Sequence, residues 1–123
     1  MKSAITDVTD LSVYQKAYAV SLEIHRISLM FPKHEQIAGL GDQVRRASKG
    51  ICANLAEGFG KQSHSKAEFK RYISIAIGSA DEMQVWLSYC RDLGYVNQID
   101  IATYQRHYRD IAKMLSGLYK RWS

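Results

Sequence analysis

The most constraining feature of the sequence is a run of apolar residues at heptad spacing in its second half. Its members follow one another at alternating intervals of four and three: Phe69, Ile73, Ala76, Ala80, Met83, Leu87 and Cys90. This spacing places all of them on one face of an α-helix. A second lane lies beside the first and holds Tyr72, Ser79, Trp86 and Leu93. A helix that is apolar along two lanes must contact more than one neighbour, so this segment predicts part of a helical bundle.

Two earlier segments carry the same helical period. The first is expected to begin at Asp10 as N-cap and to continue through Phe31. Pro32 ends it, because proline lacks a backbone N–H and disfavours helical geometry in the residue before it. After a loop, the second helix is expected to begin near Gly39 or Leu40.

The remaining helix ends carry recognisable signals. Gly58 and Gly60 are expected to close the second helix, because glycine tolerates left-handed backbone. Ser65 opens a capping box before the heptad run. Asn97 or Asp100 can cap a fourth helix. The apolar face of that helix holds Ile101, Tyr104, Tyr108, Ile111, Leu115, Leu118 and Trp122.

These segments predict an all-α fold, namely an antiparallel up-down-up-down four-helix bundle that forms a single domain over residues 10–123. Residues 1–9 show no period and are expected to be disordered or frayed. No run approaches the length of a membrane span, and the N-terminus lacks a signal-peptide pattern. Cys52 and Cys90 have no metal or redox spacing, so buried reduced thiols in a cytoplasmic protein are expected.

Positive charge is concentrated in two blocks of the chain. The net charge is +5, and residues 45–71 contribute +5 while residues 101–123 contribute +4. In the second helix Arg45, Arg46 and Lys49 lie off the apolar face and are expected to point to solvent. Such segregation suggests a surface for a polyanion, although a charged helix face is more often only a solvated face. The candidate nucleic-acid-binding residues are Arg45, Arg46, Lys49, Lys66, Lys70, Arg71, Arg106, Arg109 and Lys113.

Four other residues are assigned structural roles. Asn54 falls on the apolar face of the second helix, where a buried amide would fix register or bond to a neighbouring backbone. Glu57 is expected to pair with a basic residue at the next corner of the chain. Gly58 belongs to the small face of the second helix, and Gly78 is its expected counterpart. Close packing would compensate the cost of about 1 kcal/mol for a helical glycine, with a ligand notch at Gly78 as the weaker alternative.

No catalytic or metal-binding set is recognisable. The four histidines are scattered, and no pair has metal-ligand spacing beside a carboxylate. Ser48 and Ser79 have no obvious histidine partner. We therefore expect a protein that is not an enzyme and that holds no metal and no cofactor.

A series of short motifs resembles one known family. The motifs are Leu11-x-Val13-Tyr14-Gln15-Lys16-Ala17, Phe31-Pro32, Gly39-Leu40-x-x-Gln43-x-Arg45-Arg46-Ala47, Asn54-x-Ala56-Glu57-Gly58, and then Phe69, Ala76, Gly78-Ser79, Glu82 and Leu93-Gly94-Tyr95. In this order they resemble the bacterial four-helix-bundle proteins encoded in intervening sequences of 23S ribosomal RNA genes. The accessory proteins of diversity-generating retroelements are similar. The resemblance covers roughly residues 10–120.

The resemblance implies a ring-shaped homopentamer with a positive surface suited to nucleic acid, and RNA is the expected ligand of the intervening-sequence members. Tyr14 stands where tryptophan is commoner, and Lys49-Gly50 stands where small or apolar residues are usual. Lys49 adds charge to the basic face of the second helix. The cellular role of the family does not transfer with the fold.

Two functions are weighed. The leading one is a non-enzymatic oligomer that binds nucleic acid, RNA favoured, without strong sequence specificity. The alternative is a homo-oligomeric protein-interaction scaffold whose charge serves solubility alone. Trp86 and Tyr89 fit either a subunit interface or the edge of the core. The distinguishing observation is whether the basic residues of the second helix meet those of the third or fourth on one face.

Overall fold

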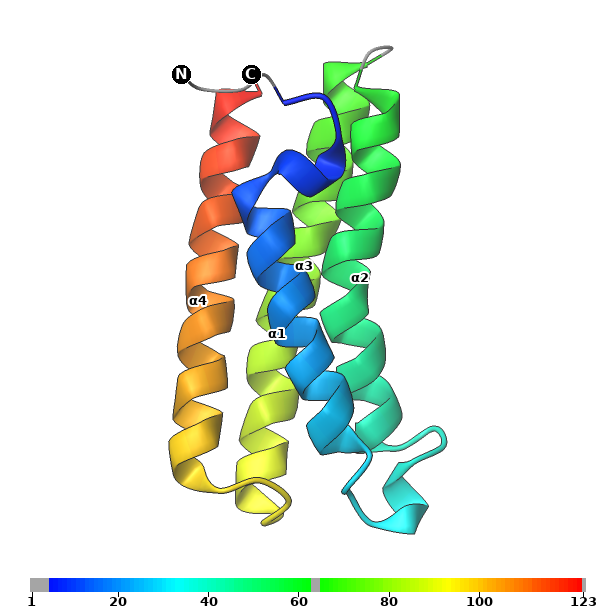
Figure 1. Cartoon of the computed structure of the whole chain (residues 1–123), viewed down its shortest axis with the longest axis vertical. Helices are drawn as coiled ribbons and strands as arrows, with labels where there is room; N and C mark the ends of the chain where they lie inside the picture. Colours follow the sequence, from blue (N-terminus) through cyan, green and yellow to red (C-terminus); the bar gives the residue numbers. More distant parts are fainter. Residues whose placement is uncertain (1–4, 63–64, 123) are drawn as a thin grey trace.

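The computed structural model describes residues 5–62 and 65–122, and within them the chain forms four long helices in antiparallel order (Figure 1). The helices are α1 (Ser12–Ser28), α2 (Leu40–Lys61), α3 (Lys66–Asp92) and α4 (Gln98–Arg121). Two short 3-10 helices, η1 (Val8–Asp10) and η2 (Lys33–Glu35), precede α1 and α2. Each long helix packs against two others, in the cyclic order α1, α2, α3, α4. The predicted four-helix bundle is confirmed.

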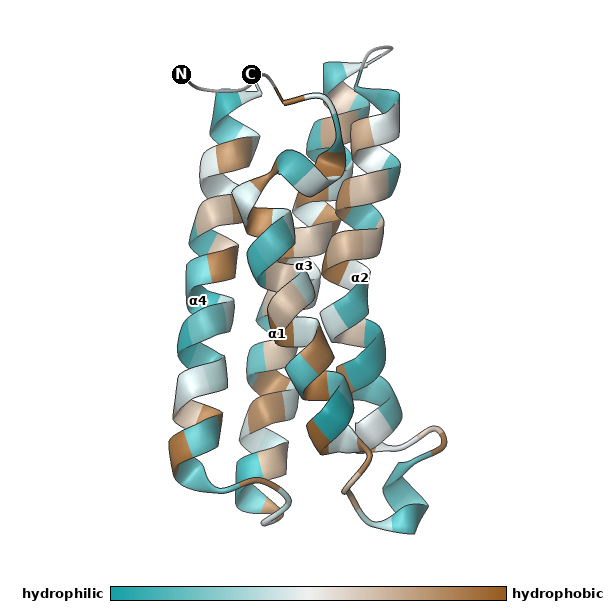
Figure 2. Cartoon of the chain, viewed as in Figure 1, coloured by the Kyte–Doolittle hydropathy of each residue, from teal (hydrophilic) through white to brown (hydrophobic). Residues whose placement is uncertain are grey.

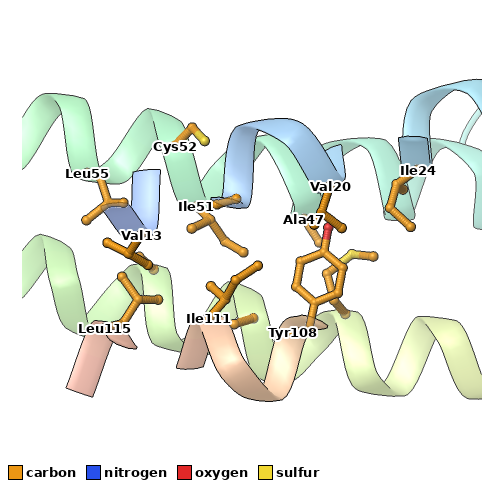
Figure 3. Close-up of a cluster of buried hydrophobic side chains, with 14 of the residues drawn as sticks. Val13, Val20, Ile24, Ala47, Ile51, Cys52, Leu55, Tyr108, Ile111 and Leu115 are labelled. Carbon is orange, nitrogen blue, oxygen red and sulfur yellow. The ribbon is translucent and has the colours of Figure 1, made fainter. Parts of the chain in front are cut away.

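The heptad run is the inner face of α3. All seven of its residues are buried, from Phe69 to Cys90. Side chains from α1, α2 and α4 meet in the same interior, among them Val13, Ile51 and Ile111 (Figure 3). Truncating a large side chain of such a core to alanine costs about 2–5 kcal/mol. Polar residues cover much of the outer side of α4 (Figure 2), as the periodic sequence predicts.

The start of α1 differs from the prediction. The N-cap of α1 is Leu11 and not Asp10. The carboxylate of Asp10 instead accepts the backbone N–H of Asp7 at 3.0 Å and so caps the start of η1. Val8 is buried in the core, so the segment expected to be frayed is folded at least at this residue, while residues 1–4 lie outside the described residues. The helix ends at Ser28, earlier than Phe31, because the chain must turn before Pro32.

The end of α2 also differs. The helix continues through Gly58 and Gly60 to Lys61, so the glycines do not close it. Gly58 is instead a point of close approach, since a Cβ placed there would lie 2.5 Å from the Cβ of Tyr72 on α3. Gly78 is not its counterpart, because it faces outward with no atom near the position of a Cβ.

The N-caps predicted at Ser65 and Asn97 are confirmed, but the capping box is only half formed, because the backbone N–H of Ser65 donates to the Lys61 carbonyl at 3.0 Å and not to the Glu68 carboxylate. Ser65 Oγ accepts the backbone N–H of Glu68 at 3.1 Å, and Asn97 Oδ1 accepts that of Asp100 at 2.9 Å. Gly94 follows α3 with a φ of +77°, the left-handed region that glycine adopts without strain. The expected loop between α2 and α3 includes residues 63–64, which lie outside the described residues. In the described part of the chain, no helix combines the length and apolar character that crossing a membrane requires.

Candidate nucleic-acid interface

The candidate cations do not converge on one face. Arg45, Arg46 and Lys49 lie in the first half of α2, at the end of the bundle that holds the α1–α2 loop (Figure 1). Lys66, Lys70 and Arg71 lie at the opposite end, at the start of α3. The candidates of α4 lie on a helix that, over the described residues, packs against α1 and α3 and not against α2. The chain therefore carries separate basic regions.

Arg45 does not point freely to solvent, contrary to the prediction. Its guanidinium is partly buried and turns toward the loop between α1 and α2. Nη1 donates to Ser28 Oγ at 2.8 Å and to Gln36 Oε1 at 3.2 Å, and Nη2 donates to the Gln36 carbonyl at 2.7 Å. Gln36 Nε2 in turn donates to the carbonyls of Ser28 and Phe31, at 2.8 and 3.0 Å. Arg45 thus anchors the loop that joins the two helices.

Lys49 lies one turn further along α2 and has a different environment. It is exposed, and its Nζ lies 3.0 Å from Nδ1 of His25 on α1. Partial burial lowers the pKa of His25 below its ordinary value of 6.5, and the nearby charges of Lys49, Arg45 and Arg26 lower it further. The lowered pKa favours the neutral imidazole near pH 7, and its Nδ1 can then accept a hydrogen bond from Lys49.

We call Arg26, Arg45 and Lys49, which lie around His25, together with Arg46 on the same helix as Lys49, the α1–α2 cluster. Arg46 is exposed and its Nε lies 3.0 Å from the carboxylate of Asp42, one turn earlier on the same helix. An exposed pair of this kind contributes roughly 0.2–0.5 kcal/mol to stability. Arg46 can therefore exchange its partner for a phosphate at little cost.

At the opposite end of the bundle, where α2 ends and α3 begins, three cations lie over tyrosine rings. Lys61 and Arg71 lie 5.3 and 5.2 Å from the ring centre of Tyr72, and Lys70 lies 4.4 Å from that of Tyr119 on α4. Arg71 also pairs loosely with a carboxylate of α3 at 3.7 Å. The contact between Lys70 and Tyr119 links this region to the last turns of α4. The remaining candidates Lys66, Arg106, Arg109 and Lys113 are exposed.

Besides Gly78, two more of the four structural assignments differ from the prediction, namely those of Asn54 and Glu57. Asn54 is only partly buried and donates through Nδ2 to the Gly50 carbonyl of its own helix at 2.7 Å, while Leu55 occupies the core position. Glu57 is exposed and accepts the hydroxyl of Tyr72 at 3.3 Å instead of pairing with a basic side chain. For Asn54 the reason is that, at 3.6 residues per turn, the apolar face of α2 continues from Ile51 to Leu55 and not to Asn54.

The two cysteines are poor nucleophiles because both are buried. Burial raises the pKa of the Cys52 thiol to about 11 and that of Cys90 to about 12, so both stay protonated near neutral pH. Both are free cysteines. Over residues 5–62 and 65–122, no three histidine, cysteine or carboxylate side chains gather closely enough to hold a metal ion.

Sequence reasoning missed the contribution of α1 to the basic region. Arg26 and His25 join Lys49 only because α1 and α2 run antiparallel side by side, as Figure 1 shows. The same packing places Tyr14 and Tyr18 of α1 beside the outer face of α2. No local motif signals these neighbours, which lie more than twenty residues away in the sequence.

Comparison with known proteins gives a family and shows the same fold in solved structures. Residues 9–117 match the protein family described as 23S rRNA-intervening sequence protein. A crystal structure of a protein of unknown function from the S23 ribosomal protein family of Bacteroides thetaiotaomicron VPI-5482 superposes with a TM-score of 0.77 at 22% sequence identity. The alignment covers 88% of this chain and 95% of that one. At this identity the likeness concerns the fold. A search of curated protein sequences found no match.

Proposed function

The chain belongs to the family of 23S rRNA-intervening sequence proteins, and from this premise we propose that it is a non-enzymatic homo-oligomer that binds RNA through the α1–α2 cluster. Binding follows charge and shape more than base sequence, because no recognition helix, stacking sheet or zinc module is present in the described chain to read base edges. Such a role would place the protein in the cytoplasm, where ribosomal RNA is found.

The observation that carries the proposal is the gathering of positive charge around one histidine. Three cations from two helices lie close enough to His25 to depress its pKa. Of the cluster, Arg26, Arg46 and Lys49 are exposed. Clustered exposed cations on one face supply the phosphate contacts that dominate affinity for nucleic acid.

An exposed apolar lane on α3 supports the oligomeric part of the proposal. Ile75, Val85 and Tyr89 are 42%, 51% and 54% exposed, and Gly78 lies open between them. Together with the exposed Glu82, which lies between Gly78 and Val85, these residues follow heptad spacing on the outer side of the helix. A mainly apolar heptad lane of this kind, with one charged position, is typical of a helix that packs against another chain. A pentamer is the assembly that the family resemblance implies.

Binding is tested by titrating the protein with a structured RNA at several salt concentrations. The log–log slope of affinity against salt should be about −0.7 to −0.9 per phosphate neutralised. Arg46→Glu with Lys49→Glu should weaken binding at least tenfold while helical circular dichroism is unchanged. The matched control is Arg106→Glu with Arg109→Glu, which makes the same charge change on exposed positions of α4.

Equal losses in both double variants would show that only net charge matters and would move the site away from the α1–α2 cluster. If the parent protein bound neither RNA nor duplex DNA with any salt dependence, the nucleic-acid function would be wrong. The scaffold function would then take its place, since its support is the α3 lane alone.

Oligomerisation has its own test, which is light scattering of the parent protein and of Val85→Glu. The parent should give a multimeric mass, and a charge in the middle of the lane should lower it toward that of one chain. A parent that is monomeric at micromolar concentration contradicts the proposed assembly. Ser116→Glu, at an exposed position of α4, is the matched control and should leave the mass unchanged.

A further inference from the structure

Two tyrosine rings form a ridge on the outer side of the bundle beside the α1–α2 cluster. Tyr14 and Tyr18 are one turn apart on α1, their ring centres are 6.1 Å apart, and their planes are inclined by only 15°. Tyr14 packs partly against the core, whereas Tyr18 is 50% exposed. A tyrosine ring with half its surface in water at an ordered site offers a flat face for another planar group.

Hollows lie on both sides of this ridge. One, of about 290 Å³, lies between α1 and α2, and its lining includes both tyrosines, Lys49, Ala53 and Ala56. The other, of about 430 Å³, is lined by both tyrosines, Thr9 and Gln15. The first hollow exists because the facing residues of α2 are small, since alanine at positions 53 and 56 leaves room that a larger side chain would fill.

The charge at one end of the first hollow is positive. Lys49 lines the hollow itself, and the remaining members of the α1–α2 cluster lie beyond it toward the α1–α2 loop. Of the residues that line this hollow, none is acidic, and its other polar groups are the hydroxyls of Tyr14, Tyr18 and Ser21 and the thiol of Cys52. An aromatic face beside a cation is the arrangement with which proteins hold an unpaired base together with its phosphate.

We propose that the Tyr14–Tyr18 ridge stacks an unpaired nucleobase in the α1–α2 hollow while Lys49 binds the adjoining phosphate. The inference rests on the proposed function and narrows it, because it makes the preferred ligand a single-stranded segment and not a continuous duplex. A base within a duplex is covered on both faces by its neighbours and cannot enter the hollow.

A docked protein helix is the competing occupant, and the geometry favours the base. A helix-in-groove site reads a row of apolar anchors over several turns. Here the exposed large apolar side chains along the hollow are Tyr18 and Leu22, and the hollow ends in a charged lysine. A volume of about 290 Å³ lies at the lower limit for small-molecule sites and suits one planar group.

The experiment uses an oligoadenylate RNA of about twelve nucleotides with a central 2-aminopurine, whose fluorescence falls when the base stacks. The DNA of the same sequence and the RNA duplex serve as parallel ligands. The parent should bind both single strands more tightly than the duplex, with fluorescence quenching on binding. The ratio between the two single strands shows whether the 2′-hydroxyl contributes.

Tyr18→Leu should weaken single-strand binding by roughly five- to a hundredfold and abolish the quenching, whereas Tyr18→Phe should retain both because the ring remains. Tyr119→Leu is the matched control, since Tyr119 is an exposed tyrosine of α4 over which Lys70 lies and it does not line the hollow. It should behave as the parent does.

Three outcomes would overturn the inference. If Tyr18→Leu binds and quenches like the parent while Arg46→Glu with Lys49→Glu loses affinity, the ridge does not stack bases, and the proposed function stands. If Tyr119→Leu loses as much as Tyr18→Leu, the stacking site is not in this hollow. If the parent binds none of the three ligands, the proposed function and the inference both fail, and the ridge is a protein-docking surface.

Discussion

Arg45 and Lys49 lie one turn apart on α2 and carry the same charge, yet the structure gives them different roles. Arg45 faces the α1–α2 loop and binds three acceptors there. Lys49 faces the side of α1, meets one neutral imidazole and stays exposed. The three acceptors of Arg45 are a hydroxyl at the end of α1 and a side-chain and a backbone oxygen of Gln36 in the loop, whereas the side of a helix has no free carbonyl oxygen to offer. The acceptors opposite a cation therefore decide whether its charge is used for stability or left for a ligand.

The loop end of the bundle extends this contrast. Glu35 accepts the backbone N–H of Leu40 at 2.9 Å, at the first turn of α2, and the hydroxyl of Tyr95 at 2.8 Å, after α3. These two hydrogen bonds lower the pKa of the Glu35 carboxyl below its ordinary value. We call Glu35, Gln36 and Arg45, with Ser28 and Tyr95, the latch, because they hold the two loops at this end together. The latch uses the charge of Arg45 for stability, whereas the hollow leaves the charge of Lys49 for a ligand.

The largest expected effect is on the latch. Arg45→Met keeps the length of the side chain but removes every donor, so it leaves Ser28 and Gln36 without their partner. Hydrogen bonds of a charged donor contribute about 1.5–3 kcal/mol each, but Arg45 is only partly buried and water can replace part of what is lost, so the stability loss should be about 2–4 kcal/mol in total. Urea unfolding monitored by circular dichroism measures it. Arg106→Met, at an exposed position of α4, should change stability by less than about 0.5 kcal/mol, and a loss equal to that of Arg45→Met would deny Arg45 its special role.

The next largest effect is expected from a methyl group added at Gly41, which lies against Glu35 and Arg45 of the latch. A Cβ on Gly41 would lie 2.9 Å from the Glu35 carbonyl oxygen and 3.2 Å from Nη1 of Arg45. Gly41→Ala should therefore destabilise the fold by about 1–3 kcal/mol through overpacking. Gly117→Ala is the matched control, because Gly117 lies within α4 with open space around it, and it should stabilise the protein by about 0.5–1 kcal/mol. Thermal unfolding of both variants gives the comparison, and the same sign for both would contradict it.

The smallest effect is on the Lys49 side, where stability should hardly change. Lys49→Gln removes a charge that depresses the pKa of His25, so that pKa should rise toward its ordinary value. His25 is protonated less readily in the folded than in the unfolded chain. Its contribution to stability is therefore present above pH 6.5 and is lost as the pH falls through the folded pKa. Lys49→Gln should reduce this acid sensitivity. NMR titration of the imidazole measures the shift, and an unchanged pKa would mean that Lys49 does not act on His25.

These residues show how far the sequence reaches toward the site. It identified Lys49 and Arg46 as exposed cations correctly, because an offset from the apolar face is a local property of the helix. It placed Arg45 on the same solvated face and was wrong, because the acceptors of Arg45 come from a loop whose path is not encoded in the helical period. It did not foresee Arg26, Tyr14 or Tyr18 beside α2, because their position depends on the register between two helices.

What the sequence by itself determined is the set of properties that repeat along a helix. The seven buried residues of α3, the caps at Ser65 and Asn97 and the turn at Gly94 follow from spacing and local hydrogen bonding. Each of these signals depends on residues no more than about four positions away along the chain.

What only the tertiary structure decided is which groups meet across helices. The register of α1 against α2 placed His25 beside Lys49, and the path of the α1–α2 loop turned Arg45 inward. Heptad faces pack almost equally well after a shift of one turn, so the pattern of apolar residues does not fix the register alone. The latch adds directional hydrogen bonds, and these bonds fix the register.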